Sequence, residues 1–182
     1  MLQITIPAIE KWDEVKEEFV YSKAYTIRLE HSLVSLSKWE SVYCKPFLSK
    51  NKMTVMETID YVRFMTITQN VPPEAYYNLT EDNMKAIEAY IDAPMTATWF
   101  SKEENNKGPM SRKIITSEVI YHWMISLNIP LEWEKRHLNR LLALIKVCRI
   151  ENQPPKKRSR KEILARNKQL NAERRNRLNT SG

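Results

Sequence analysis

The amino-acid sequence predicts a mostly helical protein with a small N-terminal β element and a basic, partly helical C-terminal tail. Apolar residues recur every three or four positions along several segments, which is the spacing of one face of a helix. Prolines end most of these segments, and the chain has nine Pro against only two Gly. Because tight hairpin turns commonly use glycine, this composition favours helices over an extensive sheet.

Charge divides the chain into two parts. Residues 152–182 hold ten Lys and Arg against two Asp and Glu, a net charge of +8. The whole chain carries +7, so residues 1–151 are nearly neutral at −1. Two prolines in Asn152–Pro155 rule out a continuous helix across the boundary. We therefore predict a mostly helical globular domain over 1–151 and a basic tail over 152–182, partly disordered or helical.

The first elements are two short strands. Apolar and polar residues alternate over Leu2–Ile6 and again over Tyr25–Leu29, which is typical of half-buried strands that could pair. The segment Asp13–Tyr21 is ambiguous, but its apolar residues together with Trp12 fit a short helix. We expect the side chains of Trp12 and Trp39 in the core.

Three helices are predicted next, over residues 30–43, 54–68 and 80–93, each by an apolar stripe that a proline or a proline pair ends. Thr54 and Glu57 match a capping box, in which each side chain satisfies the other residue's backbone N–H. Thr80 can cap the third helix.

Less regular segments surround the third helix. Residues 75–78 fit a single turn, and residues 95–100 fit a strand or another extended segment. The polar stretch 101–110 is the best candidate for a mobile exposed loop.

The largest apolar surface lies in residues 116–150, which fit two helices joined by a bend. Thr116 or Ser117 can cap the first helix, and Pro130 ends it. The second is predicted over 131–149. We expect the upstream chain to pack on this pair. The expected centre of the core consists of Trp123, Leu138, Leu141 and Ile145.

No residue pattern indicates catalysis. His31, His122 and His137 share no zinc-like spacing with a Cys or with one another. We expect His122 to be partly buried on an apolar helix, His137 to lie at a boundary, and His31 to lack a catalytic partner. Two glycines exclude a phosphate loop of the usual form. A pair of carboxylates brought together by folding stays open. We predict a protein that is not an enzyme, without catalytic residues, metal or cofactor.

The sequence shows neither a membrane span nor a signal peptide, and its two cysteines favour a reducing compartment. No apolar run approaches the roughly 18 residues that a membrane span needs. The N-terminal residues lack the basic start and apolar stretch of a signal peptide. Cys44 and Cys148 are expected to be buried free thiols in a reducing cytoplasm, although a disulfide stays open.

The basic tail is the one strongly charged feature. Its cations could each neutralise a phosphate, or dock an acidic protein. The tail has no aromatic residue to stack on a base, so nucleic-acid binding would be unselective. The candidate tail residues are Lys156, Lys157, Arg158, Arg160, Lys161, Arg166, Lys168, Arg174, Arg175 and Arg177.

Several stretches together resemble a known family. They are LEHSLVSLSKWES at Leu29–Ser41, MTITQNV at Met65–Val71, YIDAPMTAT at Tyr90–Thr98, ITSEVIYHWMISLNIP at Ile115–Pro130, HLNRLLALIKVC at His137–Cys148 and PPKKRSRKEILARNKQLNAERR at Pro154–Arg175. On these stretches the chain resembles, nearly end to end, a family of small proteins of tailed bacteriophages, some of which are called tail assembly chaperones.

The resemblance implies a protein of the host cytoplasm that binds the tape measure protein and helps tail-tube subunits polymerise around it. It implies no active site. Two alternatives remain open: a nucleic-acid-associated phage protein that uses the basic tail, and a structural virion component such as a head–tail connector or minor capsid protein. The candidate partner surface consists of Tyr76, Tyr77, Trp99 and Phe100.

Overall fold

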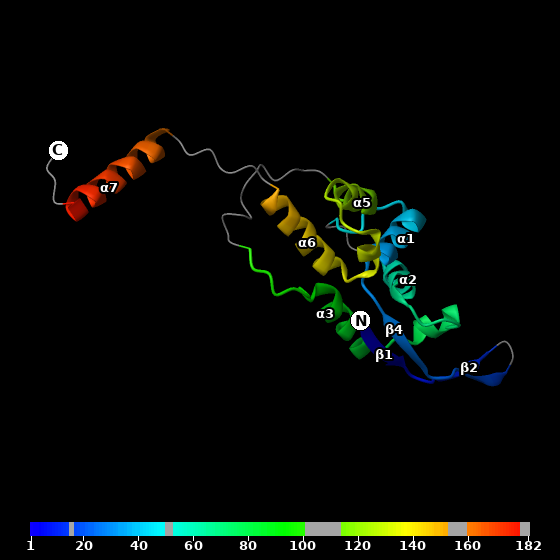
Figure 1. The fold of residues 1–182 in the computed structure, drawn as a ribbon. Coiled ribbons are helices and arrows are strands. Elements are labelled where there is room, and N and C mark those ends of the chain that lie inside the picture. The colour runs from blue at the N-terminus through cyan, green and yellow to red at the C-terminus, as the bar shows by residue number, and fades with distance from the viewer. Residues whose placement is uncertain (15–16, 50–52, 101–113, 153–159, 179–182) are drawn as a thin grey trace. The chain divides into compact units, whose positions relative to one another are not determined.

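The structure is a computed structural model that describes residues 1–14, 17–49, 53–100, 114–152 and 160–178. It confirms the predicted fold class, because the chain is mostly helical with a small antiparallel sheet near the N-terminus (Figure 1). The chain divides into two compact units, Met1–Arg149 and Ile150–Gly182.

The N-terminal strands pair as predicted. Strand β1 (Leu2–Ile6) lies antiparallel to β4 (Tyr25–Leu29), with Ile4 opposite Ile27. Side chains on one face of this pair are buried or half-buried, and those on the other face are exposed. The alternation of apolar and polar residues in the sequence therefore corresponds to the two faces of the sheet, of which the apolar one packs against the helices.

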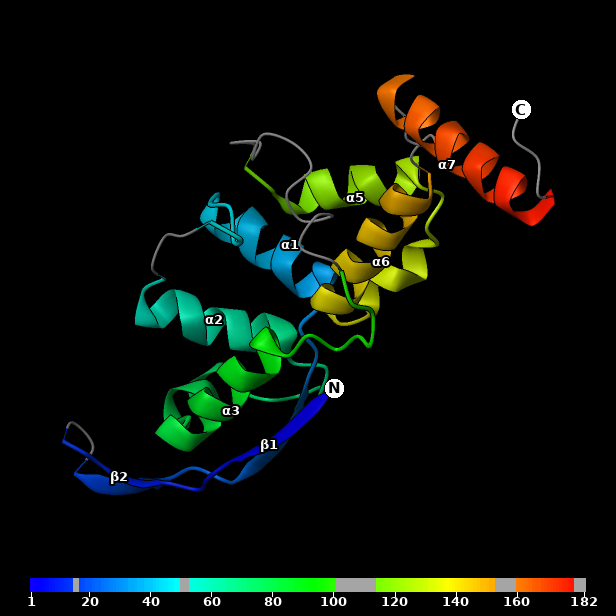
Figure 2. The ribbon, with the colours of Figure 1, turned by 90° about the vertical axis from the view of Figure 1, so that its left-hand side faces the viewer.

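The chain between these strands forms a second antiparallel pair, β2 (Glu10–Asp13) and β3 (Glu18–Tyr21), which we call the hairpin arm. The short helix predicted here is wrong. Since β1 and β4 already run side by side, extending their pairing outward gives the connecting backbone its hydrogen-bond partners. The arm projects beyond the end of the β1–β4 sheet (Figures 1 and 2). Trp12 lies on it, 48% exposed, and not in the core as expected.

Three helices follow, namely α1 (Leu33–Tyr43), α2 (Val55–Met65) and α3 (Glu81–Asp92). Each begins with a capping box, in which Ser32, Thr54 or Thr80 accepts from the backbone N–H three residues on. The sequence predicted the caps at Thr54 and Thr80. The first helix was predicted to start at residue 30, but it starts at Leu33, because Ser32 is extended and forms a β-bridge with His137.

The predicted turn before α3 is the 3₁₀ helix η1 (Pro73–Asn78). Residues 95–100, for which a strand or an extended segment was predicted, form neither a helix nor a strand. The predicted mobile loop 101–110 lies outside the described residues.

The segment 116–150 differs from its prediction at both helix starts. Helix α5 (Ser117–Ser126) begins after Thr116, but the side chain of Thr116 does not cap it. The second helix is not continuous over 131–149: a 3₁₀ helix, η2 (Leu131–Lys135), comes first, and α6 (Leu138–Glu151) starts only after the extended residue Arg136. The break lies at His137, whose backbone forms a β-bridge with Ser32 and is therefore not helical.

A buried carboxylate supplies the missing cap of α5. Glu40, on α1, is 8% exposed. Its Oε2 accepts from the backbone N–H of Ser117 at 2.7 Å, and its Oε1 accepts from that of Phe47 at 2.8 Å. The carboxylate therefore lies at the positive end of the α5 dipole and ties α5 to α1.

The interior consists of two hydrophobic clusters that share α1. The first gathers side chains from β1, β4, α1, α2, η1 and α3, with Trp39 and Tyr61 among the largest. The second joins Leu33 and Leu36 of α1 to α5, α6 and Ile129. The upstream chain does not all pack on residues 116–150 as predicted, because the first cluster contains no residue from that segment.

The expected core centre is partly correct. Leu138, Leu141 and Ile145 are buried in the second cluster, whereas Trp123 is only half-buried, with the Arg149 guanidinium 4.0 Å from its ring centroid. Trp39 is buried as predicted, and its Nε1 donates to the carbonyl oxygen of Glu57 at 2.9 Å.

Both cysteines are free thiols, as predicted, but neither is fully buried. Cys44 is exposed at the C-cap of α1, where its φ of 51° is left-handed, and Cys148 is half-buried. Across the part of the chain that the structure describes, no helix combines the length and apolar character of a membrane span.

The second unit contains helix α7 (Arg160–Leu178). Four of the candidate basic residues on it are exposed, namely Arg166, Lys168, Arg174 and Arg175. Arg160, Lys161 and Arg177 belong to the same helix. Lys156, Lys157 and Arg158 lie outside the described residues.

Candidate partner-binding surface

The hairpin arm exposes aromatic side chains on one face. Trp12 of β2 lies directly opposite Phe19 of β3, with ring centroids 4.9 Å apart in an edge-to-face arrangement. Tyr21 is two residues from Phe19, so it lies on the same face. Trp12, Phe19 and Tyr21 are 48%, 54% and 69% exposed. The arm therefore presents a continuous aromatic surface outside the core.

Local contacts hold the arm in place. The Tyr21 hydroxyl donates to Glu10 Oε1 at 2.7 Å, and this hydrogen bond raises the pKa of Tyr21. At the base of the arm, Ser22 and Ile9 exchange hydrogen bonds, with Ser22 N–H donating to Ile9 O at 2.9 Å. Asn78 of η1 donates to Ser22 Oγ at 3.2 Å. The base of the arm is thus fixed to the helical body.

A cleft of about 320 Å³ lies at this base. Tyr21 and Tyr25 line it from the strands, and Glu74 and Asn78 line it from η1. The aromatic surface of the arm therefore continues into a hollow against the body, where a bound segment could contact both.

The aromatic residues proposed from the sequence are placed differently. Tyr76 is 3% exposed and belongs to the first cluster, so it cannot contact a partner. Tyr77 is 59% exposed on η1, and Trp99 is 94% exposed. Phe100 is half-buried, with Lys146 Nζ 3.9 Å from its ring centroid. The prediction from the sequence was right that Tyr77 and Trp99 are exposed. It did not include the aromatic residues of the hairpin arm, because a helix was expected there.

Folding brings two histidines together in the interior, which the sequence did not indicate. His31 and His137 are 2% and 5% exposed, with ring centroids 5.2 Å apart. His31 Nδ1 lies 2.6 Å from the hydroxyl of Tyr61, and His137 Nε2 lies 3.0 Å from the carbonyl oxygen of Tyr90. The prediction of a boundary position for His137 is wrong. His122, expected to be partly buried, is exposed.

The histidine pair is a structural joint. Leu138 N–H donates to His31 O at 2.7 Å, so the pair connects the start of α1 to the start of α6. Burial lowers the pKa of His31 to about 4, and burial also lowers the pKa of His137. Both rings are therefore neutral at pH 7. Within the described ranges, no group of His, Cys, Asp and Glu is arranged to hold a metal ion.

Acid should weaken the fold through this joint. His31 has an ordinary pKa of 6.5 when unfolded and a pKa of about 4 when folded, so the unfolded chain binds the proton first as pH falls. Stability is therefore full above about pH 6.5 and falls between there and pH 4, by up to about 3 kcal/mol for this group. Urea melts at a series of pH values measure the loss.

A matched pair of variants separates this effect from general acid denaturation. His31→Gln should flatten the stability profile between pH 6.5 and 4, whereas His122→Gln at the exposed position should leave it unchanged. Equal slopes in the two variants would show that the buried pair does not control acid stability.

A comparison of the chain with known protein families, curated proteins and solved structures finds no match.

Proposed function

We propose that this protein is a non-enzymatic phage assembly factor, a tail assembly chaperone that binds the tape measure protein and tail-tube subunits in the host cytoplasm. The family resemblance supports this role, and the observation that carries it in the structure is the hairpin arm with its exposed Trp12, Phe19 and Tyr21. Trp and Tyr are among the residues that contribute most of the binding energy at protein interfaces.

The arm has two ways to bind a protein. Its aromatic face can pack on apolar side chains of a client. In addition, β2 and β3 pair only with each other among the described residues, so their outer edges have free backbone groups for an added strand. A two-stranded hairpin is only marginally stable alone, so a client on this surface would also stabilise the arm.

Release is part of the same role, because a chaperone leaves its client when assembly is complete. A surface of three exposed aromatic side chains is small beside an obligate interface. Binding through the arm would therefore be of the reversible kind that a chaperone needs.

Mutation of the arm tests the proposal. The double variant Trp12→Ser/Phe19→Ser should lose binding to co-expressed tape measure or tail-tube protein by about thirty-fold or more, the loss typical of interface hot spots. The variant Val42→Ser/Ile125→Ser is the matched control, because both of its residues are exposed apolar side chains on helices, at 60% and 68%. Affinity is measured by titration of the purified proteins.

Two results would contradict the proposal. One is unchanged client binding in the arm variant with the fold intact. The other is the presence of the chain at stoichiometric copy number in purified virions by mass spectrometry, which would favour the structural virion component.

A nucleic-acid-associated phage protein is the second candidate, and the exposed cations of α7 favour it. Arg166, Lys168, Arg174 and Arg175 are all exposed on one helix. Binding through them would weaken steeply and linearly in log affinity against log salt, because each phosphate contact releases counterions. Binding of a client protein through the arm would persist in moderate salt, which separates the two candidates.

A further inference from the structure

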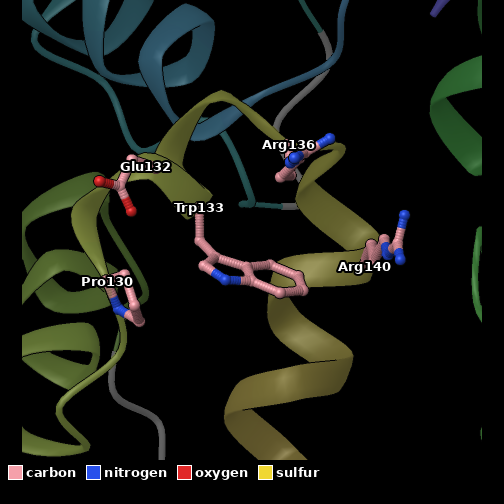
Figure 3. A pocket seen from close by; sticks show the side chains of 5 residues that line it. All are labelled: Pro130, Glu132, Trp133, Arg136 and Arg140. Carbon is pink, nitrogen blue, oxygen red and sulfur yellow. The ribbon is translucent and has the colours of Figure 1, made fainter.

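A separate pocket of about 250 Å³ lies in the first unit where η2 meets α6. Pro130, Glu132, Trp133, Arg136 and Arg140 line it. In Figure 3 the indole of Trp133 lies in the middle, with Pro130 and Glu132 on one side and the two arginines on the other. Pro130, Glu132, Arg136 and Arg140 are exposed, and Trp133 is half-buried, so the pocket opens to solvent.

The two arginines lack charged partners. Neither Arg136 nor Arg140 forms an ion pair with another residue that the structure describes. Arg140 instead places its guanidinium 5.8 Å from the Trp133 ring centroid. Both guanidinium forks thus keep N–H donors available for a carboxylate, which they match in shape.

Their position is unfavourable for α6 itself. The first turn of α6 contains no acidic residue, while Arg136 lies just before the helix and Arg140 within its first turn. Positive charge at this end opposes the helix dipole, so the arginines add nothing to helix stability. An anion at this end of α6 would be favoured by the guanidinium groups that line the pocket and by the dipole.

The pocket favours an acidic protein segment over a nucleic acid. Glu132 also lines the pocket, and its carboxylate can accept from a peptide N–H, a donor that the phosphate backbone of a nucleic acid lacks. A volume of about 250 Å³ is smaller than most small-molecule sites, and it fits one side chain with its adjoining backbone. Trp133 and the neighbouring Leu131, which is 58% exposed, offer apolar contact beside the charges.

We propose that this pocket binds an acidic segment of a partner protein, with an Asp or Glu carboxylate on Arg136 and Arg140 and an adjacent apolar side chain on Trp133. The site is distinct from the hairpin arm and does not depend on the function proposed above. It gives the nearly neutral body a specific electrostatic contact of its own.

Nuclear magnetic resonance of the full chain tests the site directly. The chain has five Trp, and Trp133→Phe removes one indole N–H signal and so assigns it. A short peptide of Glu residues that contains one Leu is the probe. The Trp133 signal should shift on titration, whereas the signal of Trp99, exposed elsewhere, should not.

Variants then identify the groups responsible. Arg136→Gln/Arg140→Gln should weaken the binding that shifts Trp133 by about tenfold or more, the value of lost charge-assisted hydrogen bonds. Arg28→Gln/Lys38→Gln removes the same charge from exposed positions outside the pocket and should leave the binding unchanged.

Three outcomes would overturn the site. They are no shift of the Trp133 signal with the acidic peptide, an equal shift with oligodeoxythymidine of matched charge, and full binding in the Arg136→Gln/Arg140→Gln variant. The second would assign the pocket to nucleic acid. None of these results depends on the arm variants, so the proposed function is tested separately.

Discussion

Replacing Glu40 by Ala is expected to lower the free energy of unfolding by about 3–5 kcal/mol. The buried carboxylate accepts from Ser117 N–H and Phe47 N–H, so its removal leaves both donors without their acceptor. Each hydrogen bond to a charged group contributes about 1.5–3 kcal/mol, and the cost rises when the partner stays buried. The loss also removes the carboxylate that accepts from Ser117 N–H at the start of α5.

Urea denaturation followed by circular dichroism measures this loss. Glu118→Ala is the control, since Glu118 is an exposed carboxylate in the first turn of the same helix. It should cost no more than about 1 kcal/mol through the helix dipole. A similar small loss for Glu40→Ala would show that water replaces the carboxylate at α5.

Leu141→Ala is expected to cost about 2–5 kcal/mol, the range for truncating a buried leucine. Leu141 is 0% exposed in the second cluster, which α1, α5 and α6 enclose. The half-buried Val119 loses fewer methyl and methylene groups, so Val119→Ala should cost less. The variant Ile125→Ala is the surface control, because the Ile125 side chain is exposed.

The same urea melts rank these variants. A loss below about 0.5 kcal/mol at Leu141 is the size expected of an exposed position, and it would contradict the packing of α6 on α1.

Local patterns predicted most elements of the fold. The alternation over Leu2–Ile6 identified a strand, and the capping box of Thr54 and Glu57 identified the start of α2. Both signals depend on residues at most a few positions apart. Prolines marked the ends for the same reason, since each acts on its own turn of backbone.

Features that depend on distant residues were not predictable from one sequence. The spacing of Trp12 and Phe19 fits one helical face, and it equally fits a cross-strand pair once β1 and β4 define the register. His31 and His137 show no common motif because folding alone brings them together. The arginines of the pocket were ordinary charges in the sequence, and only the position of Trp133 makes them a site.

The shared helix α1 has a consequence for synthesis of the chain. All residues of the first cluster lie before the end of α3, so this cluster can be completed while later residues are still being made. Leu33 and Leu36 of α1 pack on α5 and α6, which come much later. An apolar face of the nascent protein therefore stays open to solvent until α6 emerges. Growing chains on neighbouring ribosomes would meet through that face, and slow translation of the stretch before α5 would prolong its exposure.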